Sequence, residues 1–308
     1  EMPAVRNRKH IIVTKRPSIE IYSPHRRRIE TKKPPAPESR VVHGTVLKRA
    51  LESAAVDAQQ RRAEAGIRVH GAVPGLYVLF ESQPGVPLQL SSFEDKRQGI
   101  ELVAVSHSQT DEVEPRRIER ATVFVPEGKV KHFVTRFERY AVETPKAKGE
   151  RRYEDMLDPV ASLRLATLRG LWTDADDAYP GDEVIWWEVW LRRQDGREFA
   201  RLMEFAALKQ LDVAARRLQF DDRIVTLVRA TPEQLAASVD VLNDLAEVRR
   251  AKETATVFVD MAPDEQGEWT RELIARTMSP SRDAPAVCLL DTGVTRGHPL
   301  LEAALAAE

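Results

Sequence analysis

The spacing of hydrophobic residues divides the first half of the chain into helices and strands. Residues from Val46 to about Ala65 are rich in Ala, Leu, Gln, Glu and Arg, a composition that favours a helix. Three β-rich runs bounded by Gly or Pro follow, at Leu76–Phe80, Ile100–Val105 and Ala121–Val125. Apolar residues then recur at helical spacing in Val130–Val142 and in Tyr153–Trp172. We therefore expect residues 45–172 to form an N-terminal α+β domain.

A second module begins with a clearly alternating strand, Glu183–Leu191, which places Trp186 and Trp190 on one face and Trp187 on the other. Asp195 followed by Glu198 has the pattern of a capping box. The helix that this box opens carries one apolar stripe, formed by Phe199, Leu202, Met203 and Ala206.

Two further strands, at about 215–220 and 224–229, are joined by the turn Asp221-Asp222-Arg223. Thr231 with Pro232 and Gln234 predicts the capped start of another helix. Its inner stripe is Leu235, Val239, Leu242 and Ala246. A last strand is expected at about Lys252–Val259. The order β-α-β-β-α-β predicts a ferredoxin-like module at residues 183–259. The N-terminal domain could be a degenerate relative of this module, although the sequence shows no repeat.

Charge is distributed unevenly along the chain. Between Val5 and Lys48 there are twelve Lys or Arg residues and three Glu, a net charge of +9, whereas the whole chain carries -1. Five prolines discourage regular structure there, so we expect residues 1–44 to form a basic flexible arm. Such an arm could contact nucleic acid, an acidic partner or the acidic remainder of the chain. No nucleic-acid-binding motif accompanies it, which favours a solvated or intramolecularly docked arm.

The composition is that of an ordinary globular protein, with 42% hydrophobic and 31% charged residues. No run of ~18 apolar residues predicts a membrane span, and Glu1 to His10 lacks the apolar core of a secretory signal. A single cysteine, Cys288, excludes an intramolecular disulfide and fits a reducing compartment. We therefore expect a cytoplasmic protein without contact to a membrane.

The candidate chemistry lies at residues 284–308, after a polar linker at residues 260–283. The apolar run Ala286–Leu290 ends in Asp291-Thr292-Gly293, as a buried parallel strand does when it delivers a carboxylate to the edge of an open α/β sheet. His298-Pro299-Leu300 follows after four more residues. Asp-Thr-Gly alone also occurs in aspartic proteases, but the spacing to His-Pro-Leu is more specific. The string Val287–Leu300 resembles the aspartate motif of the subtilisin-like serine peptidases, the subtilases.

This resemblance implies a role for Asp291 as the aspartate of an Asp-His-Ser triad, which holds the imidazole tautomer and stabilises the imidazolium. His298 belongs to the aspartate motif and is implied to be structural. The general base of the family lies in a His-Gly-Thr motif and the nucleophile in Gly-Thr-Ser, and neither occurs in this sequence. We therefore expect this chain to hold only the start of a peptidase domain, to be inactive by itself, and to require the remainder of that domain. No cofactor is expected.

The resemblance also implies a function for the preceding module, residues 183–259. Subtilases commonly carry a β-α-β-β-α-β propeptide that docks its sheet on the peptidase and places its C-terminal tail in the cleft. The expected fold is thus α+β, with a ferredoxin-like, propeptide-like module followed by the first strand of a subtilase α/β domain. Whether the tail from Asp260 onward is cleaved, or the module stays attached as a regulatory domain, is left open by the sequence.

The layout is also similar to large bacterial cytoplasmic subtilases that are linked to defence against phage and paired with an AAA-type ATPase, which implies such a partner beside a protein or peptide substrate. The alternative is a non-catalytic binding or sensor protein with a relic subtilase segment. Two other features have ordinary interpretations. The three tryptophans are expected to be core and sheet-face residues rather than a ligand platform. The acidic run Asp174 to Glu183 is expected to be a solvated loop rather than a calcium site.

Overall fold

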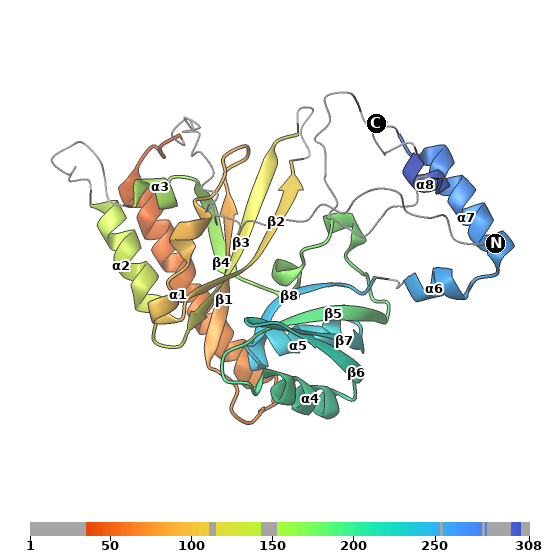
Figure 1. Cartoon of the computed structure of the whole chain (residues 1–308). Coiled ribbons are helices and arrows are strands. Elements are labelled where there is room, and N and C mark those ends of the chain that lie inside the picture. The colour runs from red at the N-terminus through yellow and green to blue at the C-terminus, as the bar shows by residue number, and fades with distance from the viewer. Residues whose placement is uncertain are drawn as a thin grey trace, which may run out of the picture.

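The computed structural model describes residues 35–110, 115–142, 153–252, 255–278, 281 and 297–302. Within these ranges the chain is α+β, as the sequence predicted, and has two antiparallel sheets of four strands each, where the first domain was expected to have only three strands. Figure 1 shows α1 and α2 beside the first sheet, the second sheet next to it, and α6 to α8 apart from both. Most of the predicted basic arm lies outside the described residues, and so do Cys288 and Asp291.

The first domain contains both helices and the first sheet, whose strands lie in the order β2-β3-β1-β4. Its elements are α1 (Arg40–Glu64), β1 (Gly75–Ser82), the short 3-10 helices η1 (Leu90–Phe93) and η2 (Lys96–Gln98), β2 (Glu101–Gln109), β3 (Arg117–Pro126), α2 (Val130–Ala141), α3 (Glu154–Leu157) and β4 (Val160–Leu165).

Helix α1 starts at Arg40 because the Ser39 hydroxyl accepts the Val42 backbone N–H at 3.3 Å and caps the free end. The prediction of an irregular arm over residues 1–44 is therefore wrong for Arg40–Gly44, which form the start of α1. Arg40 forms two hydrogen bonds with the Asp158 carboxylate, at 3.0 and 2.6 Å, and this pair ties the start of α1 to the segment before β4.

The first sheet is covered on both faces because β1 is apolar at every position from Leu76 to Phe80. Leu76, Val78 and Phe80 point to the core under α1 and α2, which Phe133 and Phe137 complete. Tyr77 and Leu79 point to the opposite face and belong to the core of the second domain. Strand β1 thus contributes to two cores at once.

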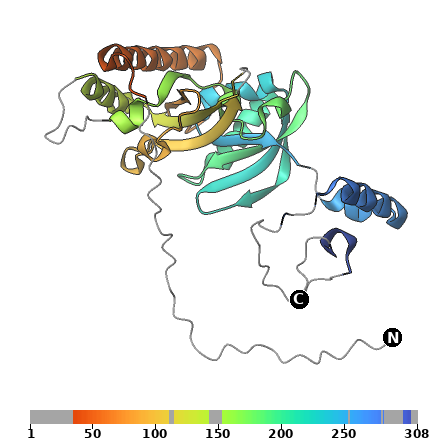
Figure 2. The ribbon, with the colours of Figure 1, turned by 90° about the horizontal axis from the view of Figure 1, so that it is seen from above.

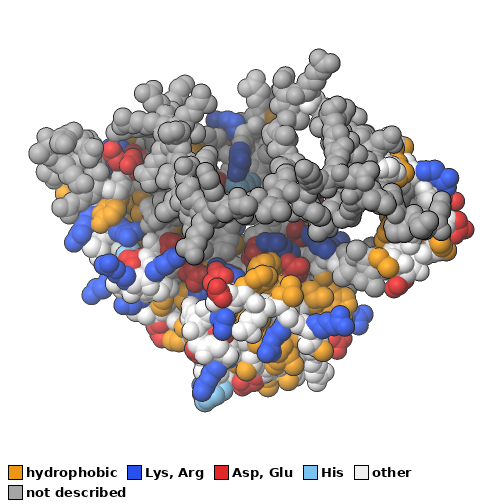
Figure 3. Space-filling view, in the orientation of Figure 1, with side chains coloured by type: hydrophobic (Ala, Val, Ile, Leu, Met, Phe, Trp, Pro, Cys, Tyr) orange, Lys and Arg blue, Asp and Glu red, His pale blue; other side chains and the backbone are white. Residues whose placement is uncertain are grey.

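The second domain has the predicted order β-α-β-β-α-β and the strand order β6-β7-β5-β8. Helices α4 and α5 cover one face of this sheet, where Trp187, Val189 and Leu191 of β5 are fully buried. Figure 3 shows hydrophobic side chains gathered over the second sheet on the side that faces the viewer. Its elements are β5 (Ile185–Arg192), α4 (Glu198–Lys209), β6 (Asp212–Gln219), β7 (Arg223–Ala230), α5 (Pro232–Val241) and β8 (Leu245–Arg250).

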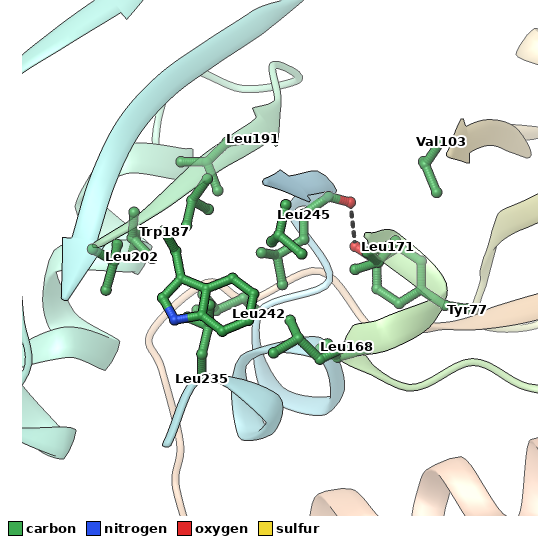
Figure 4. Close-up of a cluster of buried hydrophobic side chains, with 14 of the residues drawn as sticks. Tyr77, Val103, Leu168, Leu171, Trp187, Leu191, Leu202, Leu235, Leu242 and Leu245 are labelled. Carbon is green, nitrogen blue, oxygen red and sulfur yellow. Dashed lines mark hydrogen bonds between the residues drawn. The ribbon is translucent and has the colours of Figure 1, made fainter. Parts of the chain in front are cut away.

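The two domains share a hydrophobic core through the 3-10 helix η3 (Leu168–Leu171). Figure 4 shows Leu168 and Leu171 between Tyr77 of the first sheet and Leu242 and Leu245 of the second domain. The buried Tyr77 hydroxyl donates to the Leu245 carbonyl at 2.7 Å, and burial raises the pKa of this phenol well above its usual range. The domains are therefore joined by continuous packing.

The helix predicted for Tyr153–Trp172 was wrong. The segment forms the single turn α3, strand β4 and helix η3. Pro159 follows α3 and prevents its continuation, and β4 pairs with β1 from Val78 to Ser82. Pairing across the chain overrides the local helical pattern here.

The last strand was also predicted too late. Strand β8 occupies Leu245–Arg250, whereas most of the expected strand Lys252–Val259 forms helix α6 (Ala255–Asp260). The predicted linker at residues 260–283 contains the 14-residue helix α7 (Pro263–Arg276). Figure 2 shows α7 apart from the sheets in a second view. Helix η4 (Asp176–Ala178) and the short α8 (Pro299–Glu302) complete the described elements.

Two details of the second domain differ from prediction. Helix α4 begins at Glu198 rather than after an Asp195 cap, and Met203 is exposed while Phe205 takes its place in the core. The capping box of α5 is confirmed: Thr231 and Gln234 exchange hydrogen bonds between side chains and backbone.

Among the described helices, none has the length and apolar character needed to cross a membrane.

Candidate interaction surface and the aspartate motif

The second sheet has one face that none of the described helices covers, and this face is the strongest candidate interaction surface. Trp186, Glu188 and Trp190 alternate with the buried side of β5 and so point to the uncovered side. Directly paired residues share a face. The strand pairing therefore adds Val225, Leu227, Arg229, Leu218, Glu247 and Arg249 to the same surface. We call these residues and Phe220, after β6, the open face.

Aromatic and aliphatic side chains dominate its outer part. Trp190 and Phe220 stack in parallel with ring centroids 6.0 Å apart, and the Arg249 guanidinium lies 4.9 Å from the Trp190 ring. Trp186 is 40% exposed, Phe220 48% and Leu218 63%. Contiguous exposed apolar side chains of this size mark contact surfaces rather than ordinary solvated positions.

The charges on the open face are paired with one another. Arg249 donates to Glu247 at 2.8 Å, and Trp190 Nε1 donates to Glu188 at 2.7 Å. The Thr173 hydroxyl donates to Glu247 at 2.7 Å and accepts from Arg249 at 3.1 Å. Arg229, opposite Trp186, lies 3.7 Å from Asp212. The face therefore combines paired charges with the apolar area of a protein contact, rather than the unpaired positive charge of a phosphate-binding surface.

A buried ionic network joins helix α4 to the loop between β5 and α4 and to the segment before β8. Arg201, almost fully buried, makes two hydrogen bonds to Asp244 and two to Asp195. Burial opposes the charge of Arg201, but these carboxylates raise its pKa above its ordinary value. The same pairing lowers the pKa of Asp195 to about 2. The buried Glu198 accepts the backbone N–H groups of residues 194 to 196, which fixes the loop before α4.

A second buried arginine lies where the domains meet. The Arg192 guanidinium lies 3.7 Å from the centre of the Phe124 ring on β3, and its Nε is 3.5 Å from Glu101 at the start of β2. Glu101 also pairs with Arg223 at 2.8 Å. One carboxylate of the first domain thus contacts two arginines of the second. The cluster fixes the position of the domains and contains no nucleophile.

The predicted catalytic residue, Asp291, lies outside the described residues. His298 is described: its Nδ1 accepts the Leu300 backbone N–H at 3.3 Å, and Pro299 opens α8. This arrangement caps a helix turn; the structural role of His298 within a peptidase motif stays a prediction.

The described histidines outside the motif have other partners. His107 pairs with Glu119 at 3.1 Å, and His132 lies 3.9 Å from Asp95. His43 Nε2 donates to the Val160 carbonyl at 2.9 Å, while its Nδ1 lies 2.9 Å from the Tyr140 hydroxyl. None of these contacts includes a serine or cysteine nucleophile.

The tryptophans of β5 divide between the two faces of the second sheet, and the acidic run has basic partners. Trp187 is core, and its indole donates to the Ala230 carbonyl at 2.9 Å, while Trp186 and Trp190 lie on the open face. In the acidic run, Asp174 pairs with Lys252 at 2.7 Å and Asp176 with Arg120 at 3.1 Å. No group of three or more candidate metal ligands occurs among the residues that the structure describes.

Comparisons with known proteins add no family to this description. Models of known protein families give no match to the chain, and curated proteins give none either.

Sequence reasoning missed the buried arginines and the carboxylates that they contact. Arg192 ends a strand that otherwise reads as apolar, and Arg201 interrupts the inner stripe of α4. A charged residue inside an apolar stripe is the signal that could have found them, because such residues are buried only with partners.

Proposed function

We propose that this chain is the N-terminal regulatory region of a subtilisin-like serine endopeptidase, with a ferredoxin-like, propeptide-like second domain. The observation that carries the proposal is the sequence order of two features, the second domain and then the aspartate motif. A β-α-β-β-α-β domain with an uncovered apolar sheet face is followed, after helices α6 and α7, by a segment that reads apolar strand, Asp-Thr-Gly, four residues, His-Pro-Leu. A domain that docks through its sheet requires such a face.

In this proposal the carboxylate of Asp291 orients and steadies the catalytic imidazole while a serine attacks the peptide carbonyl. The sequence holds neither the His-Gly-Thr nor the Gly-Thr-Ser motif, so base, nucleophile and oxyanion hole would come from the downstream part of the same protein. The 308 residues alone would then have no peptidase activity. The substrate would be a protein or peptide, and the setting cytoplasmic, with an AAA-type ATPase as a candidate partner.

The rival function is a non-catalytic binding protein that uses the same open face. The paired charges and the Trp190–Phe220 stack suit either one, because both require a protein contact. What favours the peptidase is the length of the motif, which extends over fourteen residues and includes His298 at a helix cap.

The test is peptide-bond hydrolysis by the full-length protein, with Asp291→Asn as the variant. We expect the turnover rate to fall by roughly 10⁴-fold, because the imidazole loses its orienting partner. Asp283→Asn, eight residues earlier, is the matched control and should leave the rate unchanged. Full-length protein that folds but hydrolyses no unstructured substrate, or an Asp291→Asn variant as active as the parent, would support the non-catalytic alternative.

A further inference from the structure

Helix α7 gathers its charged side chains on one side. At about 100° per residue, all of its charged residues fall within an arc of roughly 140°, and the remaining arc of roughly 220° carries none. The charged side consists of Asp264, Glu265, Glu268, Arg271, Glu272 and Arg276. The uncharged arc contains Gln266, Trp269, Thr270, Leu273 and Ile274. An apolar stripe of this width is what a helix on the surface of a globular domain buries.

The stripe is nevertheless uncovered. Trp269 is 51% exposed, Leu273 40% and Ile274 39%, and α7 has no buried residue. Figures 1 and 2 show the helix apart from both sheets. A single helix of this length is marginally stable in water by itself, so its stability in the protein depends on a packing partner.

Local signals still specify this segment as a helix and not as an extended linker. Pro263 occupies the first turn together with Asp264 and Glu265, and Arg276 lies in the last turn, as the helix dipole favours. The Gln266 amide donates to three carbonyls at the end of α6 and the turn after it, those of Phe258, Val259 and Met261. The α6–α7 turn is therefore fixed by its own side chains.

We propose that the stripe of Trp269, Leu273 and Ile274 packs against the domain predicted to begin with the apolar segment Val287–Asp291, so that α7 is the first element of that domain. This rests on the proposed function, which supplies the downstream domain. Helix α8, which follows that segment in sequence, lies beside α7 (Figure 1). The structure thus places an element from beyond Asp291 against the helix.

The length of the connection supports the same partner. Seven residues separate Met278 from Ala286, the start of the apolar run. They span at most about 28 Å when fully extended. The downstream domain is therefore held close to the stripe, at a local concentration that a separate chain reaches only with difficulty.

This placement moves the domain boundary. The regulatory region ends after β8, and the boundary falls in residues 251–262 instead of at 283. Peptidase clefts bind substrates as extended strands, and a bond inside α7 is not presented in that form. If the N-terminal region is released by cleavage, the bond lies before Pro263.

Amide hydrogen exchange tests this in the full-length protein, with a chain ending at Glu308 as the reference. Backbone amides of α7 should exchange at least roughly tenfold more slowly in the full-length protein than in the shorter chain. Trp269→Ala with Leu273→Ala should remove most of that difference. Glu268→Ala with Arg271→Ala, on the charged side, is the matched control and should retain it.

Three results would overturn the inference. The first is equal exchange of α7 in both chain lengths. The second is protection that disappears on dilution, which would assign the stripe to a second copy. The third is protection lost in Trp186→Ala with Phe220→Ala, which would assign it to the open face. The proposed function fails separately, because slow exchange of α7 in a full-length protein without peptidase activity would leave this inference intact.

Discussion

In both domains the four strands lie in the order second, third, first, fourth, with every neighbouring pair antiparallel. Their irregularities also correspond: the register shifts between first and fourth strands and between second and third, and stays regular between first and third. The domains differ in the connection after the first strand. The second has helix α4 there, whereas the first has only η1 and η2 and places α1, from before the sheet, over the core.

The two sheets have the same strand order but differ in which of their faces are covered. The first sheet is covered on both faces, by α1 and α2 on one side and by the second domain on the other. The second sheet keeps one face uncovered. The first domain therefore acts as support, and the second carries the surface available to a partner.

The largest expected effect comes from removing one core side chain of each domain. Phe80 packs against Phe93 and Phe133, and Trp187 against Trp172 and Tyr179. Phe80→Ala and Trp187→Ala should each lower the free energy of unfolding by about 3–5 kcal/mol. Because the domains share a core, both variants should shift a single transition in urea, followed by circular dichroism. Two separate transitions would show that the domains unfold independently.

A smaller effect is expected in the pH dependence of the free energy of unfolding, which should differ between the two domains. Burial lowers the pKa of His43 in the first domain below 6.5, so the unfolded chain binds its proton more readily than the folded one. Stability from this group is present above pH 6.5 and is lost as the pH falls below it. In the second domain, Arg201 lowers the pKa of Asp195 from 3.8 to about 2, so that contribution is lost only between these values.

The measurement is the urea midpoint of wild type, His43→Gln and Asp195→Asn at pH values from 7.5 to 3. His43→Gln should flatten the slope just below pH 6.5 and leave the slope below pH 4 unchanged. Asp195→Asn should do the reverse. Identical pH profiles for the three proteins would contradict the assignment of either group.

The smallest change in stability should come from the open face. Trp186→Ala with Phe220→Ala removes exposed side chains, so each substitution should change the free energy of unfolding by no more than roughly 0.5 kcal/mol. If the face docks on the peptidase domain and restrains it, the same variant should raise the activity of the full-length enzyme. Leu208→Ala is the control, because Leu208 is 55% exposed on α4. An unchanged rate in the double variant would argue against such restraint.

The sequence predicted the second domain well because its signals agree with one another. Alternation in β5, the Asp221–Arg223 turn and the Thr231 cap are local, and tertiary packing reinforces each of them. Strand β4 was missed because a six-residue edge strand is specified by its pairing with β1, 80 residues away, rather than by its own pattern.

Helix α7 could have been found from Pro263, the acids that follow it and Arg276, a start-and-stop pattern that the polar composition obscured. The contacts of Arg192 and Arg201 depend on how the chain folds and cannot be derived from spacing alone. The same holds for the open face: the alternation of Trp186 and Trp187 predicts two faces but not which one the helices cover.

The Arg40–Asp158 pair has a mechanical consequence. Tension on the chain ahead of Arg40 reaches these two hydrogen bonds first and then pulls α1 away from β4, along the axis of the helix. Strand β1, clamped between β3 and β4 and anchored in both cores, is loaded only afterwards. A motor that pulls from the N-terminus would thus break the Arg40–Asp158 hydrogen bonds before it loads the pairing of β1. It would detach α1 from the first sheet before it unfolds the second sheet.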